Sequence, residues 1–202
     1  MRSCCVLLAV SLLVWTVLAV GCKTKDPVIP ITVLPPVTDF LASTTAPTAN
    51  LVFLRGEPLD DETVIIEVMI QGQTTSSDIY SFSFDLVLSN PLLAELVTGS
   101  ELLGSALVPS GGQGTSVQVA QNGDRIVVGV TKTNGGSGNG VGAGAETIVT
   151  FEMRALRGGE TELRFAGAPP GPSDPLAEDS KGDLIGSIVF DPLPAKIVSL
   201  GT

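Results

Sequence analysis

The sequence predicts an all-β protein, and three observations support this prediction. Apolar and polar side chains alternate with a period of two along several short segments. Glycine occurs 23 times and proline 14 times among 202 residues, which suits many turns between strands better than it suits helices. Hydrophobic residues make up 44% of the chain, which is enough to bury a core. The expected architecture is two antiparallel sheets packed face to face.

The residue composition excludes several kinds of chemistry. The chain contains no histidine, so it cannot carry a Ser-His-Asp or Cys-His catalytic arrangement or an imidazole zinc site. Its formal net charge of −10 argues against a nucleic-acid partner, because phosphates are contacted chiefly by Lys and Arg. Carboxylates such as Glu67 and Asp85 could hydrolyse glycosides if a cleft held them together, but nothing in the sequence pairs them. We therefore expect a protein that is not an enzyme.

Residues 1–21 have the features of a secretory signal. A short positive start, Met1-Arg2, precedes an apolar run from Val6 to Val20, which is shorter than the roughly 20 residues of a membrane-spanning helix. Small residues directly before Cys22 resemble the lipobox of bacterial lipoproteins, in which the cysteine carries the lipid. We expect Cys22 to anchor an exported protein in the bacterial cell envelope, at the outer membrane or cell surface. An ordinary cleaved signal and an uncleaved anchor are the alternatives.

Residues 22–47 are expected to form a tether. Five prolines follow Cys22 within this stretch, and proline-rich sequence without periodicity is semi-extended and packs poorly. They are Pro27, Pro30, Pro35, Pro36 and Pro47. The folded domain is then expected to span residues 48–202.

Within that domain, the alternation predicts a series of short strands. It is clearest in residues 63–71 and in residues 81–88, where Ser81, Ser83 and Asp85 separate the apolar positions. Two valine-rich segments flank Asn122-Gly123-Asp124, which is a strong signal for a hairpin. Further strands are expected around residues 149–153, 163–165, 188–190 and 197–200. Only residues 91–103 could hold a helical turn.

The order of these segments resembles that of a cohesin domain. Residues 63–71 and the run Tyr80–Pro91, with its Phe-Asp-Leu, look like the second and third strands of that family. The further matching segments are Glu101–Gly104, Gly142–Ala155, Gly159–Leu163 and Asp179–Ile185. The resemblance implies a nine-stranded, jelly-roll-like β-sandwich, an architecture that several carbohydrate-binding modules also use.

The resemblance also implies a partner. Cohesins bind dockerin domains and so assemble polysaccharide-degrading enzymes on scaffolds or cell surfaces. The outward polar positions with which cohesins hold dockerin fall on Ser81 and Ser83, with Asp85 next along the strand; the two serines are smaller than the family's residues and uncharged. A cohesin-like protein-binding module, with Ser81, Ser83 and Asp85 as candidate binding residues, is the leading hypothesis.

Two loops are candidates for ligand binding. Residues 134–144 hold six glycines, but no Gly-Lys-Ser/Thr follows, so we expect a flexible inter-strand loop and no phosphate site. Asp174, Asp179 and Asp183 form an acidic loop together with Glu178, and carboxylates at short spacing can bind Ca²⁺. Because the loop lacks the order of an EF-hand, a solvated loop is favoured over a Ca²⁺ site, and no other cofactor is expected.

Two other functions remain as alternatives. A carbohydrate-binding module would need exposed aromatic rings, whereas Trp15 lies in the signal and Tyr80 is the only tyrosine. Phe82, Phe84 and Phe151 occupy positions expected in the core, as does Phe165. The other alternative is a structural envelope lipoprotein that binds surface proteins through a sheet face or strand edge.

Overall fold

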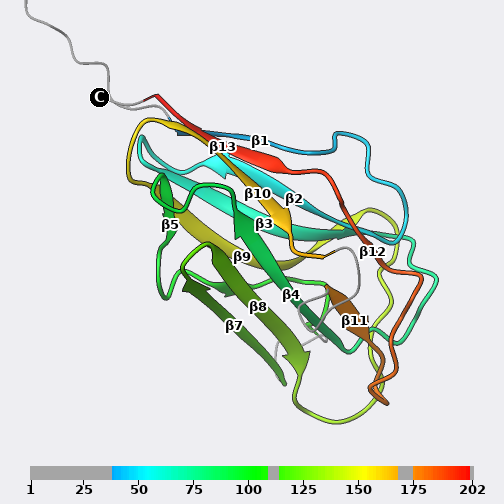
Figure 1. Cartoon of the computed structure of the whole chain (residues 1–202). Coiled ribbons are helices and arrows are strands. Elements are labelled where there is room, and N and C mark those ends of the chain that lie inside the picture. The colour runs from blue at the N-terminus through cyan, green and yellow to red at the C-terminus, as the bar shows by residue number, and fades with distance from the viewer. Residues whose placement is uncertain (1–37, 109–113, 168–174, 201–202) are drawn as a thin grey trace, which may run out of the picture. The chain divides into compact units, whose positions relative to one another are not determined.

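The computed structural model describes residues 38–108, 114–167 and 175–200, and these residues form thirteen β-strands and no helix (Figure 1). The strands are β1 (Thr38–Leu41), β2 (Leu51–Pro58), β3 (Thr63–Gln71), β4 (Ser81–Leu88), β5 (Ala94–Leu96), β6 (Leu102–Leu103), β7 (Thr115–Asn122), β8 (Arg125–Lys132), β9 (Ala145–Ala155), β10 (Gly159–Phe165), β11 (Leu176–Glu178), β12 (Val189–Phe190) and β13 (Ala195–Ser199). None of these described residues lies in a helix long and apolar enough to cross a membrane.

The strands form two sheets that pack into a sandwich. The seven-stranded sheet has the order β1-β13-β10-β4-β8-β7, with β11 also paired to β4. The six-stranded sheet has the order β12-β2-β3-β9-β5, with β6 also paired to β9. The prediction of an all-β, two-sheet sandwich is confirmed. The strand count differs from the expected nine, because four strands of two or three residues, too short to show alternation, accompany nine longer ones.

Alternation along β4 directs every second side chain into the core. Phe82, Phe84, Leu86 and Leu88 are at most 2% exposed, while the residues between them face outward. Phe84 packs edge-on against Phe165, with ring centroids 5.4 Å apart, and against Phe190 at 5.7 Å. The aromatic residues therefore stabilise the join between the two sheets.

The hairpin expected around residues 122–124 is confirmed. Asn122 pairs with Arg125, so Gly123 and Asp124 form a two-residue loop between β7 and β8. Gly123 has a φ of 64°, and Asp124 is not among the residues with positive φ. A positive φ at the first central position alone is the pattern of a type II′ turn, which favours glycine there.

The sandwich begins earlier than residue 48. Within the stretch expected to be a tether, β1 pairs antiparallel with β13, and Phe40 is buried. The hydroxyl of Thr38 also donates to the carbonyl of Asp61, 2.7 Å away. Residues 38–41 therefore belong to the packed domain. The rest of the expected tether before residue 38, together with Cys22 and the signal, lies outside the described residues.

The helical turn considered for residues 91–103 is not formed. Residues 91–93 make a turn, and β5 and β6 then pair with β9. Ala94 and Leu96 are buried because β5 covers the edge of the six-stranded sheet. Pairing with a strand some 50 residues further along the chain outweighs the local preference of the leucine-rich segment for helix.

Candidate functional site

The three candidate binding residues lie in a line on the outward side of β4. Ser83 is exposed, and Ser81 and Asp85 are half-buried. The hydroxyl of Ser81 donates to Oε2 of Glu178 on β11, 2.9 Å away. Oδ2 of Asp85 accepts a hydrogen bond from Nη1 of Arg125 on β8 at 2.9 Å. The strand therefore presents two serine hydroxyls and one carboxylate, and the carboxylate of Asp85 is paired with Arg125.

Small, uncharged side chains extend this line across β8 and β7. Ser83 is opposite Gly129, which is opposite Gln118 on β7. We name the outward surface formed by Ser81, Ser83, Ser116, Gln118, Gly129 and Thr131 the serine face. A hollow of about 330 Å³ lies over it, with Glu178 at its border. Because Gly129 has no side chain and its Cβ position meets open space, another backbone can approach the sheet closely here.

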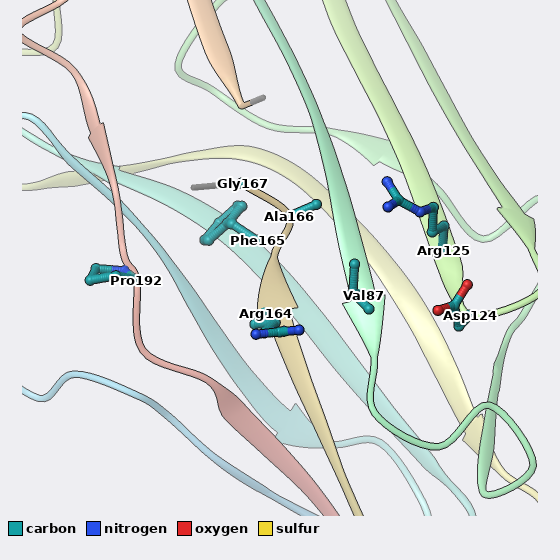
Figure 2. A pocket seen from close by; sticks show the side chains of 8 residues that line it. All are labelled: Val87, Asp124, Arg125, Arg164, Phe165, Ala166, Gly167 and Pro192. Carbon is teal, nitrogen blue, oxygen red and sulfur yellow. The ribbon is translucent and has the colours of Figure 1, made fainter. Parts of the chain in front are cut away.

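A second hollow, of about 350 Å³, lies at the other end of β4 (Figure 2). Val87 stands between Arg164 of β10 and Arg125 of β8, with which it is in register. Arg125 is paired with Asp85, whereas no described carboxylate forms an ion pair with Arg164. This end of the sheet therefore offers one cation, Arg164, for a charged hydrogen bond, with the carboxylate of Asp124 in the same lining.

The loop of residues 133–144 is held by specific contacts, contrary to the expectation of a flexible loop. Ile79 and Asn139 form a β-bridge, with backbone bonds of 2.8 Å in both directions. Val141 is buried, and its amide donates to the hydroxyl of Thr74 at 2.8 Å. A Cβ on Gly138 would lie 2.4 Å from the carbonyl carbon of Asp78. Glycine is needed there because the two segments touch.

Two charged side chains fasten this loop. Nζ of the buried Lys132 donates to the carbonyl of Ser137 at 2.8 Å and to Oδ1 of Asn139 at 3.2 Å. Asp78 accepts bonds from the hydroxyl of Ser180, at 2.7 Å, and from the amide of Gly138. The bond from Ser180, followed by that from Gly138, holds the pKa of Asp78 below its ordinary value, although burial opposes them. These contacts hold the loop of residues 133–144 and the turn at Ser180 against the segment that precedes β4.

The acidic loop shows a structural role for one of the Ca²⁺ candidates. Oδ1 of Asp179 accepts bonds from the amides of Lys181 and Asp183, at 2.8 and 3.0 Å, and so closes a turn. Asp174 lies outside the described residues. Within the part of the chain that the structure describes, no three acidic, Cys or His side chains are grouped so that they could hold a metal ion.

Glu67 and Asp85 are separated by the sandwich. Glu67 faces outward from β3 and Asp85 faces outward from β4, which belongs to the other sheet. Their ion-pair partners, Arg55 and Arg125, are likewise on different sheets. These two carboxylates therefore cannot act on one glycosidic bond.

Aromatic side chains are used in the core. Phe82, Phe84, Phe151 and Phe165 are all buried, as their positions predicted. All Phe and Tyr side chains in residues 38–108, 114–167 and 175–200 are buried or half-buried. These residues therefore present no flat aromatic surface on which a sugar could stack.

Comparison with solved structures identifies the fold. The second type II cohesin module of the adaptor scaffoldin ScaA from Acetivibrio cellulolyticus matches with a TM-score of 0.51 and 13% sequence identity, over 81% of this chain and 90% of that module. The domain has a cohesin-like fold. A non-cellulosomal cohesin from the archaeon Archaeoglobus fulgidus, at 17% identity, has a TM-score of 0.44 over 76% of this chain and 86% of that one. No protein-family model and no curated protein matches the sequence.

Sequence reasoning missed several residues of this cohesin-like domain that shape the candidate site. Gly129, Gln118 and Ser116 come from β7 and β8, and only strand pairing brings them beside Ser83. Arg164 is placed next to Val87 by the pairing of β10 with β4. The alternation within the hairpin does mark which of its residues face outward, but it does not show which strand lies beside it.

Proposed function

We propose that this chain is a non-catalytic protein-recognition module that is exported and held in the bacterial cell envelope by a lipid on Cys22. Its serine face binds a dockerin-like domain of another surface protein, and so contributes to surface assembly or polysaccharide degradation. The lipid anchor rests on the lipobox-like residues before Cys22. The binding role rests on the cohesin-like fold and on the character of the serine face.

The observation that carries the proposal is the hollow over Ser83, Gly129 and Gln118. Most side chains there are uncharged, so a docking partner displaces few strongly bound waters, and the one carboxylate at the border, Glu178, accepts a hydrogen bond from Ser81. The polar hydroxyl and amide groups can exchange hydrogen bonds with that partner. Arg164 and Val87 extend the same sheet face with one cation and one apolar contact.

Gly129→Arg tests the proposal because it fills the centre of the hollow without strain. The Cβ position meets no atom within 4 Å, and Gly129 is not among the residues with positive φ. Purified type I and type II dockerin domains are titrated into the parent chain by calorimetry. We expect at least one to bind the parent, and Gly129→Arg to weaken that binding at least ten-fold.

Thr150→Arg is the matched control, because it adds the same side chain to the outward face of β9 in the other sheet. Its affinity should stay within two-fold of that of the parent. Failure of every dockerin to bind the parent, or equal loss in both variants, would contradict the proposal. Retardation of the parent on a soluble-glycan panel without dockerin binding would favour the carbohydrate-binding alternative.

A further inference from the structure

The edge strands of the two sheets differ in how they are protected against pairing. β1 has four residues and carries Asp39, β5 has three and carries Glu95, and β12 has two. Short edges and charged side chains both discourage the addition of another strand. At the remaining edge, β7 has eight residues, Thr115–Asn122, without a charge, a proline or a register shift against β8 (Figure 1).

The backbone of β7 has unpaired groups along its outer side. The amide of Thr133 donates a hydrogen bond to the carbonyl of Gly114. The backbone amides and carbonyls of the even-numbered residues of β7 therefore point towards β8. The amides and carbonyls of Thr115, Val117, Val119 and Gln121 therefore point away from the sheet. Within the described chain, no strand pairs with this side of β7, and no backbone hydrogen bond outside the strand ladder reaches these groups.

We propose that two copies of this chain pair antiparallel through β7, so that the two seven-stranded sheets become one. A second copy fits the edge because Thr115–Asn122 carries no charge, so a two-fold pair of β7 strands brings only uncharged residues into contact although the net charge of each chain is −10. The unpaired backbone groups of one copy are the complements of those of the other.

The spacing of the free groups fixes the register. Hydrogen-bonded pairs between the two copies must form among the four odd-numbered residues, because only their backbone groups point outward. The register that pairs all four residues places Val117 opposite Val119 of the second copy and Thr115 opposite Gln121. The two-fold axis then lies between the two Gln118 residues, whose side chains are exposed on the outward face. Gln118 of one copy is directly opposite Gln118 of the other in a non-hydrogen-bonded pair, with Cα atoms about 4.5 Å apart. The two serine faces become neighbours on one continuous sheet.

Gln118→Cys tests this register in the full-length chain, expressed in a bacterial host and oxidised in intact cells. Cysteines about 4.5 Å apart across a non-bonded pair can form a disulfide. We expect the amount of covalent dimer on a non-reducing gel to be at least five-fold higher for Gln118→Cys than for the parent. Any dimer of the parent, formed through its own cysteines, is the background. Mass spectrometry should identify residue 118 on both sides of the link.

Ser116→Cys is the matched control on the same strand and face. In the proposed register it lies opposite Ala120 of the second copy, too far from its own counterpart to be linked, so it should give only the parent level of dimer. Equal linking of Gln118→Cys and Ser116→Cys, a link from residue 118 to a different protein, or no link above the parent would each overturn the proposal.

A second experiment places a charged side chain at the two-fold axis and measures whether two copies still associate. Two differently tagged copies of the full-length chain are co-expressed without added partner, and one tag is captured. Gln118→Lys places two ammonium groups opposite each other and should lower co-capture at least ten-fold, whereas the neutral Gln118→Ser should not change it. Co-capture unaffected by Gln118→Lys would overturn the proposal, and the result does not depend on whether a dockerin binds.

Discussion

The serine face differs in charge from the outward face of the six-stranded sheet, while the ion pairs Asp85–Arg125 and Glu160–Lys196 lie elsewhere on the seven-stranded sheet. On the six-stranded sheet, ion pairs link neighbouring strands: Arg55 of β2 lies 3.6 Å from Glu67 of β3, and Arg154 of β9 bonds Glu95 of β5. We name these four residues the ion-pair face. The serine face of the other sheet carries no charged side chain, and Asp85 beside it is paired with Arg125.

The difference shows how one scaffold can make one side suitable for contact with another protein. The ion-pair face is satisfied within the monomer and well hydrated, so covering it would cost the desolvation of four charges. Covering the serine face affects only one bordering charge, that of Glu178, and Gly129 leaves room for a partner's backbone. The comparison therefore supports the proposal that the seven-stranded sheet is the one that recognises a partner.

The largest expected effect tests whether β4 has a buried side and an outward side. Phe84→Asp places a carboxylate among Phe165 and Phe190 and should cost at least about 4 kcal/mol of unfolding free energy, which abolishes folding. Ser83→Asp, one residue away on the serine face, should change it by less than about 0.5 kcal/mol. Urea denaturation followed by circular dichroism measures both. A native transition in Phe84→Asp would show that the strand register is wrong.

A smaller effect concerns the loop that supports the start of the serine face. Gly138→Ala forces a methyl group against the backbone of Asp78 and Ile79, and should cost about 1–3 kcal/mol. Gly142→Ala is the control, because its Cβ position is open and its φ is not positive. Thermal unfolding compares the two variants. Equal stability of both would mean that the loop is not held against residues 78 and 79.

Ion pairs on the two sheets should differ in strength. Asp85 is 16% exposed and bonds Arg125 at 2.9 Å, whereas the more exposed Arg55 and Glu67 are 3.6 Å apart. A double-mutant cycle should give about 1 kcal/mol for the first pair and under about 0.5 kcal/mol for the second, and both should shrink in about 1 M salt. If the Arg55–Glu67 pair had the larger coupling energy, the expected difference between the two sheets would be contradicted.

The smallest effect is a dependence of stability on pH. Asp78 has a lowered pKa in the folded chain, so it contributes stability above its ordinary value of 3.8, and this contribution is lost as the pH falls further. Asp78→Asn should lower the urea midpoint at pH 7, and the gap to the parent should close towards pH 3. A gap that stays constant between these pH values would contradict the role of the Asp78 carboxylate.

Local patterns in the sequence were sufficient for much of the fold. Strand β3 has the bounds that alternation predicts, and the inward side of β4 is as expected. The turn between β7 and β8 follows from the glycine at its first central position. Strand β1 was missed because four residues beside a proline-rich stretch show too little alternation, and only pairing with β13 makes them a strand.

The candidate site was predictable only along one strand. Ser81, Ser83 and Asp85 share an outward line because strand periodicity dictates it. Gln118 and Gly129 join them through pairing across more than 30 residues, and Asp78 meets Ser180 over a separation of 102 residues. No local pattern encodes such separations, which depend on how the whole chain packs.

The most direct test of the proposed recognition surface is chemical-shift mapping of the ¹⁵N-labelled chain during titration with a dockerin domain. We predict that the largest amide shifts fall on Ser83, Gly129 and Gln118, whereas Arg55, Glu67 and Arg154 on the opposite sheet stay unchanged. Shifts concentrated on the ion-pair face would contradict the account.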